Sequence, residues 1–216
     1  MRPCQRIFIA ALALCAVTAA LAAGVDSALD RYLAGLQSLQ ADFSQEARDV
    51  HGKLVERGKG HLVIQRPGRF RWEFKADGVD GDGGQLMVAD GRNLWFYERE
   101  LAQVTVRDAA SALGATPVVL LSGTSSDIES AFTVRSAGSG GGLERVEIIP
   151  HAIAADFSRA EIGFRGAVLA SMDISNKLGQ TVHMNFTHVE RNRALAPGLL
   201  DFVVPPGVDV IGTALK

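Results

Sequence analysis

Seven consecutive residues near the middle of the chain alternate without a break between charged and apolar side chains. The run reads Arg69-Phe70-Arg71-Trp72-Glu73-Phe74-Lys75. Successive side chains of a strand point to opposite faces of a sheet, so this alternation predicts a strand with one buried face and one solvated face. Three large aromatic rings are more than a thin sheet needs to pack against one short helix. We therefore expect a sheet that curves around something apolar, although plain core packing accounts for the same row.

Arg66 stands just before this strand and in register with a second apolar row. Leu62 and Ile64 alternate with other residues in the preceding segment, so Arg66 would end an otherwise apolar face. A charged side chain in such a place usually has a particular partner, whereas a solvated turn residue before Pro67 is the simpler alternative. Our hypothesis is that the apolar face lines a cavity for lipid chains and that Arg66 helps to close it.

Short segments of strand character follow one another along the chain, separated by turn residues such as Asp90-Gly91, a strong hairpin signal. Strands or strand-like segments are expected at residues 40–49, 58–65, 69–75, 85–89, 93–98, 102–108, 132–136, 143–149, 161–164, 168–174, 180–190 and 202–204. About eleven short strands with few helices indicate a mainly β fold, an antiparallel and strongly bent sheet or open barrel. The length suits a single domain with one sizeable core.

Two stretches have helical rather than strand character. Apolar residues from Val25 to Leu36 recur at helical spacing, which predicts a first helix over 25–39 that packs on one side of the sheet. Thr116-Pro117 is typical of a helix start, and the segment from Ser126 to Glu129 fits a capping box that opens another short helix. These two short helices are expected to form a lid across the open side of the sheet. A crossover that fills ordinary core fits the pattern equally well.

The first residues have the features of a secretory signal peptide. Arg2 and Arg6 precede an apolar run over 7–20, and small residues stand at the two positions that a signal peptidase reads. The apolar run is too short for a good membrane span. We therefore expect a signal peptide at 1–22, cleaved after Ala22 with Ala23 as the alternative, and an exported, soluble mature protein.

Both cysteines of the chain, Cys4 and Cys15, lie inside this leader, so the domain expected over 23–216 has no disulfide. In the alternative reading, residues 12–15 serve as a lipidation signal and Cys15 becomes an acylated N-terminus. Without the leader the chain holds 20 basic and 24 acidic residues, a net charge of about −4. That balance argues against nucleic acid as a partner.

No group of residues has the pattern of a catalytic or metal site. The five histidines lack the spacing of metal ligands, and His183 and His188 are expected on opposite faces of their strand. The loop at 77–84 is rich in Asp and Gly but lacks the EF-hand spacing, and the serines that follow Gly123 lack a nucleophile elbow. We therefore expect a binding protein rather than an enzyme, with no cofactor and no metal.

With these segments in place, the chain resembles the periplasmic outer-membrane lipoprotein carrier (LolA) family over essentially its whole mature length. The motifs that carry the resemblance are, in order, Phe43-Ser44-Gln45, Gly58-Lys59-Gly60-His61-Leu62, Arg66-Pro67-Gly68-Arg69-Phe70-Arg71-Trp72-Glu73-Phe74, Asp90-Gly91, Leu94-Trp95-Phe96-Tyr97, Thr116-Pro117, Gly179-Gln180 and Phe202-Val203-Val204-Pro205-Pro206-Gly207. Each motif is short, and the block from Arg66 to Phe74 is the most specific of them.

The resemblance implies an incomplete barrel covered by a lid of short helices, with the acyl chains of a lipoprotein held between them. It also implies that Arg66 bonds backbone carbonyls of the lid and keeps the free form closed. The residues expected to line the acyl-chain cavity are Leu62, Ile64, Phe70, Trp72, Phe74, Leu94, Phe96, Val118, Leu120, Leu121, Met184 and Phe186. The implied partners of this monomer are acylated lipoproteins, an inner-membrane ABC-type lipoprotein-releasing complex and an outer-membrane lipoprotein acceptor.

Two other functions stay open at this point. One is the outer-membrane acceptor itself, a lipoprotein of similar fold anchored through Cys15. The other is a periplasmic binder of lipids or glycolipids. The mass of the mature N-terminus separates the first from a soluble carrier, and the molecules that co-purify with the protein identify the second.

Overall fold

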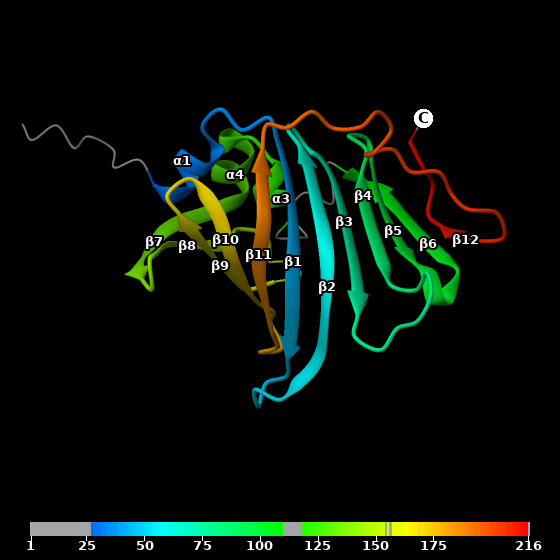
Figure 1. Ribbon diagram of the computed structural model, residues 1–216, viewed down its shortest axis with the longest axis horizontal. Coiled ribbons are helices and arrows are strands. Elements are labelled where there is room, and N and C mark those ends of the chain that lie inside the picture. The colour runs from blue at the N-terminus through cyan, green and yellow to red at the C-terminus, as the bar shows by residue number, and fades with distance from the viewer. Residues whose placement is uncertain (1–26, 110–117, 154, 156, 216) are drawn as a thin grey trace, which may run out of the picture.

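Twelve strands form one continuous open sheet that makes up most of the protein (Figure 1). The computed structural model describes residues 27–109, 118–153, 155 and 157–215. The strands are β1 (Ser38–Arg48), β2 (Leu54–Gln65), β3 (Arg69–Ala76), β4 (Gln85–Ala89), β5 (Asn93–Glu98), β6 (Gln103–Asp108), β7 (Phe132–Gly140), β8 (Leu143–Pro150), β9 (Arg159–Arg165), β10 (Val168–Ser175), β11 (Thr181–Arg191) and β12 (Asp209–Ile211). Their order across the sheet is β12-β6-β5-β4-β3-β2-β1-β11-β10-β9-β8-β7, which leaves β12 and β7 as the edges. The predicted mainly β, incompletely closed fold is confirmed.

Neighbouring strands are antiparallel with one exception, the short edge strand β12, which runs parallel to β6. Three short helices lie together near one end of the strands (Figure 1). They are α1 (Ala28–Leu33), α3 (Val118–Ser122) and α4 (Ser125–Ala131), and a 3₁₀ turn, η1 (Arg99–Leu101), lies between β5 and β6. The longest of these described helices has seven residues. Helices this short are not stable alone in water, so they depend on burying apolar side chains against the sheet.

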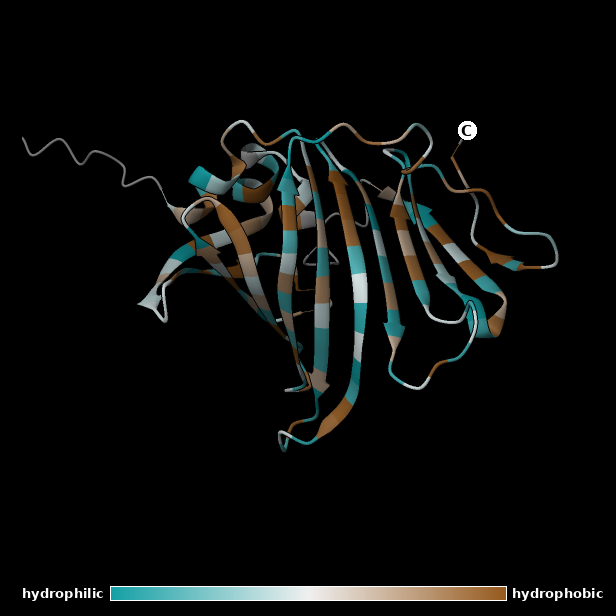
Figure 2. Ribbon diagram, viewed as in Figure 1, coloured by the Kyte–Doolittle hydropathy of each residue, from teal (hydrophilic) through white to brown (hydrophobic). Residues whose placement is uncertain are grey.

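The register between strands places the apolar rows of the sequence on one face of the sheet, called the inner face below. Leu62 pairs with Trp72 and Ile64 with Phe70 across β2 and β3. Residues directly opposite each other in neighbouring strands share a face, so the same face continues into the strands on either side. Figure 2 shows hydrophilic and hydrophobic residues alternating along the central strands. The helices cover the inner face, and the main hydrophobic core lies between them.

A second, smaller apolar core lies on the opposite, outer face of β4, β5 and β6. Its buried members are Leu86, Val88, Val104, Val106 and Leu200. The segment after β11 covers this core, and the Phe202 ring lies 5.3 Å from that of Trp95 and 6.2 Å from that of Tyr97. The buried Asn93 side chain exchanges two hydrogen bonds with the Leu215 backbone, at 3.1 and 2.7 Å. This half of the sheet therefore packs apolar side chains on its outer face, while Leu94 and Phe96 on its inner face are half-buried.

Two element boundaries near the ends of the chain differ from the sequence predictions. The first helix ends at Leu33 instead of residue 39, because Gly35 adopts a left-handed conformation with φ of +64° and β1 already begins at Ser38. The last strand is β12 rather than 202–204, because Phe202 packs its ring on the outer core and Pro205-Pro206 follows. Proline has no backbone N–H to contribute to a sheet ladder.

The helices after β6 follow the prediction in part. The predicted start at Thr116-Pro117 lies outside the described residues. Helix α4 is capped by Thr124 rather than by Ser126, with Asp127 in the third helical position completing the capping box. In the part of the chain that the structure describes, no helix is long and apolar enough to cross a membrane.

A β-bulge between β1 and β11 corrects one further prediction. The register shifts between Gln40 and Asp42, and His188 adopts a φ of +50° at this point. The extra residue turns His188 to the outer face, where its Nδ1 lies 2.9 Å from Asp42. His183 is on the same face, with its Nδ1 2.5 Å from Asp173. The prediction of opposite faces, which rests on simple alternation, is therefore wrong for these two histidines.

Candidate functional site

Four aromatic rings lie next to one another on the inner face. The Phe43 and Trp72 rings are 5.8 Å apart and inclined by 14°, and the Trp72 and Phe74 rings are 5.6 Å apart and inclined by 18°. Phe186 of β11 lies 6.2 Å from Phe43 on the other side. Trp72 is half-buried, whereas the other three are buried. These four rings form an apolar surface, called the aromatic floor below, in which the Phe186 ring is tilted by 57° against that of Phe43.

Two glycines of β2 make room for the aromatic floor. A Cβ atom on Gly60 would lie 2.2 Å from Cζ of Phe43, and one on Gly58 would lie 2.7 Å from the Phe74 ring. Both positions also face backbone carbonyl oxygens of β3, at 2.1 and 2.2 Å. The Gly58-Lys59-Gly60 motif therefore lets aromatic rings lie directly over the backbone of β2, which is a known use of glycine within strands.

Helix α3 covers the end of the inner face nearest to the helices. Leu120 and Leu121 are fully buried. They belong to the same apolar cluster as Leu62, Ile64 and Phe70. The side chains of this helix therefore occupy apolar surface that a ligand of the inner face would need.

Arg66 joins α1 and α3 through backbone carbonyls. Its Nη1 donates to the Leu33 oxygen at 2.9 Å and to the Leu36 oxygen at 3.5 Å, at and just beyond the end of α1. Its Nε and Nη2 donate to the Gly123 oxygen, just after α3, at 3.1 and 2.8 Å. Carbonyls at helix C-termini lack partners within the helix, so the planar guanidinium supplies donors where the chain needs them.

The environment of Arg66 leaves its charge in place. Burial lowers the pKa of Arg66, while Tyr32 and Asp127 nearby act in the opposite direction. An arginine guanidinium nevertheless keeps its proton in proteins. The Asp127 carboxylate is itself held by the Thr124 cap, whose hydrogen bonds lower the pKa of Asp127. Arg66 thus acts as a permanently charged donor between two helix ends.

Arg191, at the end of β11, makes a related contact on α1. It donates to the carbonyls of Tyr32 at 2.9 Å, Ala34 at 3.2 Å and Ala167 at 2.7 Å, and its guanidinium carbon lies 5.8 Å from the centre of the Tyr32 ring. Within the described residues, none of these hydrogen bonds reaches α3. Both arginines therefore fix α1 to the sheet, whereas Arg66 also holds α3.

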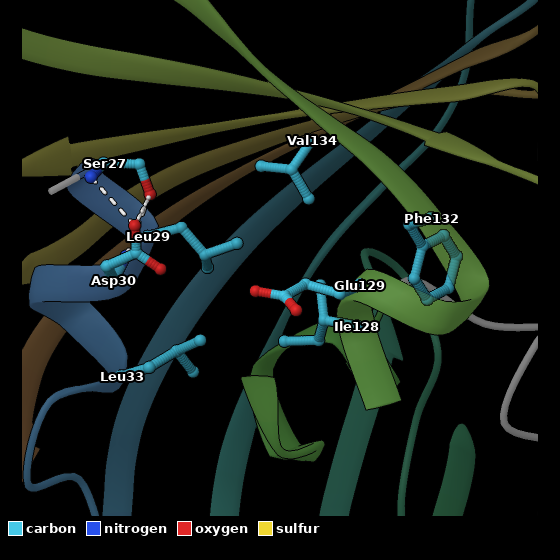
Figure 3. A pocket seen from close by; sticks show the side chains of 8 residues that line it. All are labelled: Ser27, Leu29, Asp30, Leu33, Ile128, Glu129, Phe132 and Val134. Carbon is cyan, nitrogen blue, oxygen red and sulfur yellow. Dashed lines mark hydrogen bonds between the residues drawn. The ribbon is translucent and has the colours of Figure 1, made fainter. Parts of the chain in front are cut away.

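A cavity of about 310 Å³ lies between α1, α4 and β7 (Figure 3). Its lining residues are Ser27, Leu29, Asp30, Leu33, Ile128, Glu129, Phe132 and Val134. Asp30 takes part in the Ser27 cap of α1, and both carboxylates of the lining are exposed. The lining shares no residue with the set predicted for acyl chains. Because the Leu33 carbonyl accepts from Arg66, this cavity adjoins the contact that joins the helices.

Most of the residues predicted for the site share the inner face or its cover. The buried ones are Leu62, Ile64, Phe70, Phe74, Leu120, Leu121, Met184 and Phe186. Trp72, Leu94 and Phe96 are half-buried. The Val118 side chain lies outside the described residues. Contact of any of these residues with an acyl chain remains a prediction.

Sequence reasoning missed several members of the inner face, among them Met87 and Phe43. Met87 of β4 pairs with Trp72 on one side and Phe96 on the other. Phe43 stacks on Trp72 at the centre of the aromatic floor. The signal for Phe43 was present, because Ala41, Phe43 and Gln45 alternate in the strand predicted over 40–49.

The chain matches a family of known proteins over most of its length. The sequence profile described as "Outer membrane lipoprotein carrier protein LolA" matches residues 34–203. The outer-membrane lipoprotein carrier protein of Dechloromonas aromatica is 37% identical over 190 residues, which cover 88% of each chain. That of Chromobacterium violaceum is 35% identical over 211 residues, or 98% of each chain. The chain belongs to the outer-membrane lipoprotein carrier family.

This family assignment confirms the resemblance found in the sequence. A solved structure of an uncharacterized conserved protein from Thermus thermophilus is similar with a TM-score of 0.52, over 85% of this chain and 96% of that one. It is only 14% identical, so it supports the fold alone. The function of this family member has to account for two features, the apolar inner face and the Arg66 contact that holds α3 over it.

Proposed function

We propose that this protein is a periplasmic carrier that binds the acyl chains of lipoproteins and delivers them to an outer-membrane acceptor. Its donor would be an inner-membrane ABC-type lipoprotein-releasing complex, and a leader at 1–22 would export the chain. The observation that carries the proposal is an apolar inner face covered by a short helix that is tied down through Arg66. Membership of the lipoprotein carrier family supports the same cargo.

The need for such a carrier follows from the solvation of acyl chains. Each methylene moved from water to an apolar site contributes about 0.8 kcal/mol, so an exposed triacylated lipoprotein does not leave a membrane at a useful rate. The aromatic floor and the leucines around it offer the chains an apolar surface. Because Leu120 and Leu121 occupy part of this surface, bound chains would take the place of α3 side chains.

Arg66 would then set how strongly cargo is held. Displacing α3 breaks the hydrogen bonds from Arg66 to the Gly123 carbonyl, and the free energy of those bonds opposes loading. The same free energy is regained when cargo leaves and α3 closes again. A carrier of this kind covers its cargo, yet releases it to an acceptor that binds the chains without such an opposing term.

The two tryptophans allow a direct test of where acyl chains bind. Trp72 lies on the inner face, whereas the Trp95 indole is bonded to Asp90 at 2.7 Å on the outer face. The chain has no other tryptophan. Single-tryptophan variants, Trp95→Phe and Trp72→Phe, are titrated with a synthetic triacylated lipopeptide that carries brominated chains, which quench indole fluorescence at short range.

We expect quenching in the variant that keeps Trp72 and little change in the variant that keeps Trp95. The same peptide without acyl chains serves as the control and should quench neither. Equal quenching of both tryptophans would indicate adsorption rather than binding to the inner face, and no binding at all would contradict the carrier function. The mass of the mature N-terminus separately tests the alternative of an acceptor anchored through Cys15.

A further inference from the structure

Four exposed apolar side chains lie in two hairpins at the end of the central strands remote from α1, and a fifth lies in the β8–β9 connection, whose His151 amide bonds the Ala131 carbonyl at the end of α4. They are Val50 (56% exposed), Leu54 (37%), Val55 (57%), Leu178 (75%) and Ile153 (92%). Four of them belong to the β1–β2 and β10–β11 hairpins, which project away from α1, α3 and α4 (Figure 1). Lys177 bonds the Ile153 carbonyl and so joins the third connection to them. These five residues are called the tip below.

The two hairpin turns of the tip touch each other and are built alike. The Cβ position of Gly179 is 3.2 Å from a methyl carbon of Val50. In the first turn, the Asp49 carboxylate accepts from the amides of residues 51 and 53 at 2.9 and 3.0 Å. In the second, the Asn176 side-chain oxygen accepts from the amides of residues 178 and 180, both at 2.9 Å.

This construction suits a surface that enters an apolar medium. A backbone amide moved out of water without a partner is costly, and these turns satisfy four amides internally. Each turn also carries a lysine, Lys53 or Lys177, whose long side chain can reach back to a polar headgroup layer. The Lys53 ammonium has no partner in the part of the chain that the structure describes.

We propose that the tip inserts into the interfacial layer of a lipid bilayer when the carrier collects or delivers its cargo. The proposal rests on the carrier function, because cargo anchored by acyl chains starts and ends its passage in a membrane. The tip is a pair of convex turns with isolated apolar side chains. Fluid lipid accommodates such a shape, whereas a protein partner would need a matching groove.

The inner face leads directly to the tip. Phe186, Met184 and Val182 follow one another on the same side of β11 and run from the aromatic floor toward the turn that holds Leu178. Val182 and Ile174 pair with each other next to this turn and pack against the main core. A tip held in the bilayer interface therefore points the hairpin end of the inner face at the lipid, which shortens the path of an acyl chain through water.

The charges around the tip indicate that apolar insertion dominates the contact. Arg48 and Arg57 share the single carboxylate of Glu46, the Asp49 carboxylate accepts from backbone amides, and the Lys177 ammonium bonds the Ile153 carbonyl. Lys53 is the cation of the tip without a partner among the described residues, and so few cations provide only a modest attraction to anionic lipids. We therefore expect binding to depend more on Val50 and Leu178 than on the anionic lipid content.

The test is flotation of the full-length mature protein with vesicles of phosphatidylethanolamine and phosphatidylglycerol at a 3:1 ratio. Leu178→Asp and Val50→Asp place a charge in the tip. Val203→Asp is the matched control, because Val203 is 84% exposed but follows the opposite end of β11. The lipid concentration for half-binding should rise at least tenfold in each tip variant and stay unchanged in the control. A Leu178→Trp variant should show blue-shifted emission on binding.

Several outcomes would overturn the proposal. Equal vesicle binding by the wild type and Leu178→Asp excludes the tip as the contact. No vesicle binding by the wild type, together with defective uptake from the inner-membrane complex in the tip variants, indicates a protein partner at the tip instead. Binding of the triacylated lipopeptide in solution is measured for the same variants. If the wild type does not bind the lipopeptide, the carrier function is refuted. If the wild type binds the lipopeptide but not the vesicles, only the tip proposal is refuted.

Discussion

Replacing Arg66 with leucine removes the side chain that ties α1 to α3 and leaves the apolar surfaces of both helices intact. A hydrogen bond from a charged donor contributes about 1.5–3 kcal/mol. The bonds to the Leu33 and Leu36 carbonyls do not change when α3 moves, so only the contact with the Gly123 carbonyl favours the closed state. Because Arg66 is half-buried and water replaces part of what is lost, we count one bond of the lower value, about 1.5 kcal/mol. A difference of about 1.4 kcal/mol is tenfold in an equilibrium constant, so the closed state weakens by roughly tenfold.

Cargo that binds only after α3 moves should gain affinity by a similar factor in Arg66→Leu, because more of the protein is ready to bind. The dissociation constant of the lipopeptide is measured by Trp72 quenching in the Trp95→Phe background. Transfer to acceptor vesicles should be correspondingly slow. The lipopeptide affinity of Arg66→Lys should lie between those of the wild type and Arg66→Leu. Lysine keeps the charge but lacks the planar guanidinium that bonds several carbonyls at once.

Arg191→Leu is the matched control for this prediction. It removes three hydrogen bonds to carbonyls, two of them on α1, without removing any to α3 among the described residues. The variant should be less stable to denaturant, yet its affinity for the lipopeptide should not rise. An equal gain of affinity in both variants, or an unchanged affinity in a folded Arg66→Leu protein, would refute the reasoning.

Three further predictions concern stability. The buried Tyr32 hydroxyl has no hydrogen-bond partner among the described residues, so Tyr32→Phe should raise the free energy of unfolding by about 1 kcal/mol in urea titration; a decrease would reveal a missing partner. Gly60→Val drives methyl groups into the Phe43 ring and should lower the free energy of unfolding by about 3 kcal/mol. Gly35→Ala should lower it by less, because no atom lies within 4 Å of the added Cβ. Hydrogen bonds from Thr124 lower the pKa of Asp127, so the stability that Asp127 adds over Asp127→Asn is present above about pH 4 and lost as the pH falls further; a constant difference across pH 2–6 would contradict this.

The part of the fold that follows strict alternation was predictable from the sequence. Residues 69–75 carry their periodicity openly, and the structure puts Phe70, Trp72 and Phe74 on one face as expected. The first helix was overestimated because Leu36 and Leu39 fit a helical period, although Gly35 ends the helix and both side chains are buried outside it. Periodicity measures where apolar residues recur and does not detect a single left-handed residue.

Other features depend on long-range contacts that no local pattern contains. The outer core exists because Phe202 meets Trp95, over a hundred residues earlier in the chain, and so β5 also packs against apolar side chains on its outer face. The bulge that turns His188 outward arises from a mismatch between β1 and β11. For the candidate site, the sequence identified Arg66 as a charge in need of a partner. The family resemblance implied carbonyls of the lid, such as that of Gly123 after α3, but not the Leu33 carbonyl at the end of α1. The residues alone identify neither partner, because carbonyl groups are the same in every residue.

The latch formed by Arg66 uses main-chain acceptors alone. The carbonyls of residues 33, 36 and 123 are present whatever side chains stand there, so substitutions in α1 and α3 alter packing without removing an acceptor. The guanidinium, for its part, does not titrate at any pH that a folded protein experiences. The hydrogen bonds of this contact therefore persist when the pH changes and when residues of the two helices are substituted. The one side chain whose replacement removes all of them is that of Arg66.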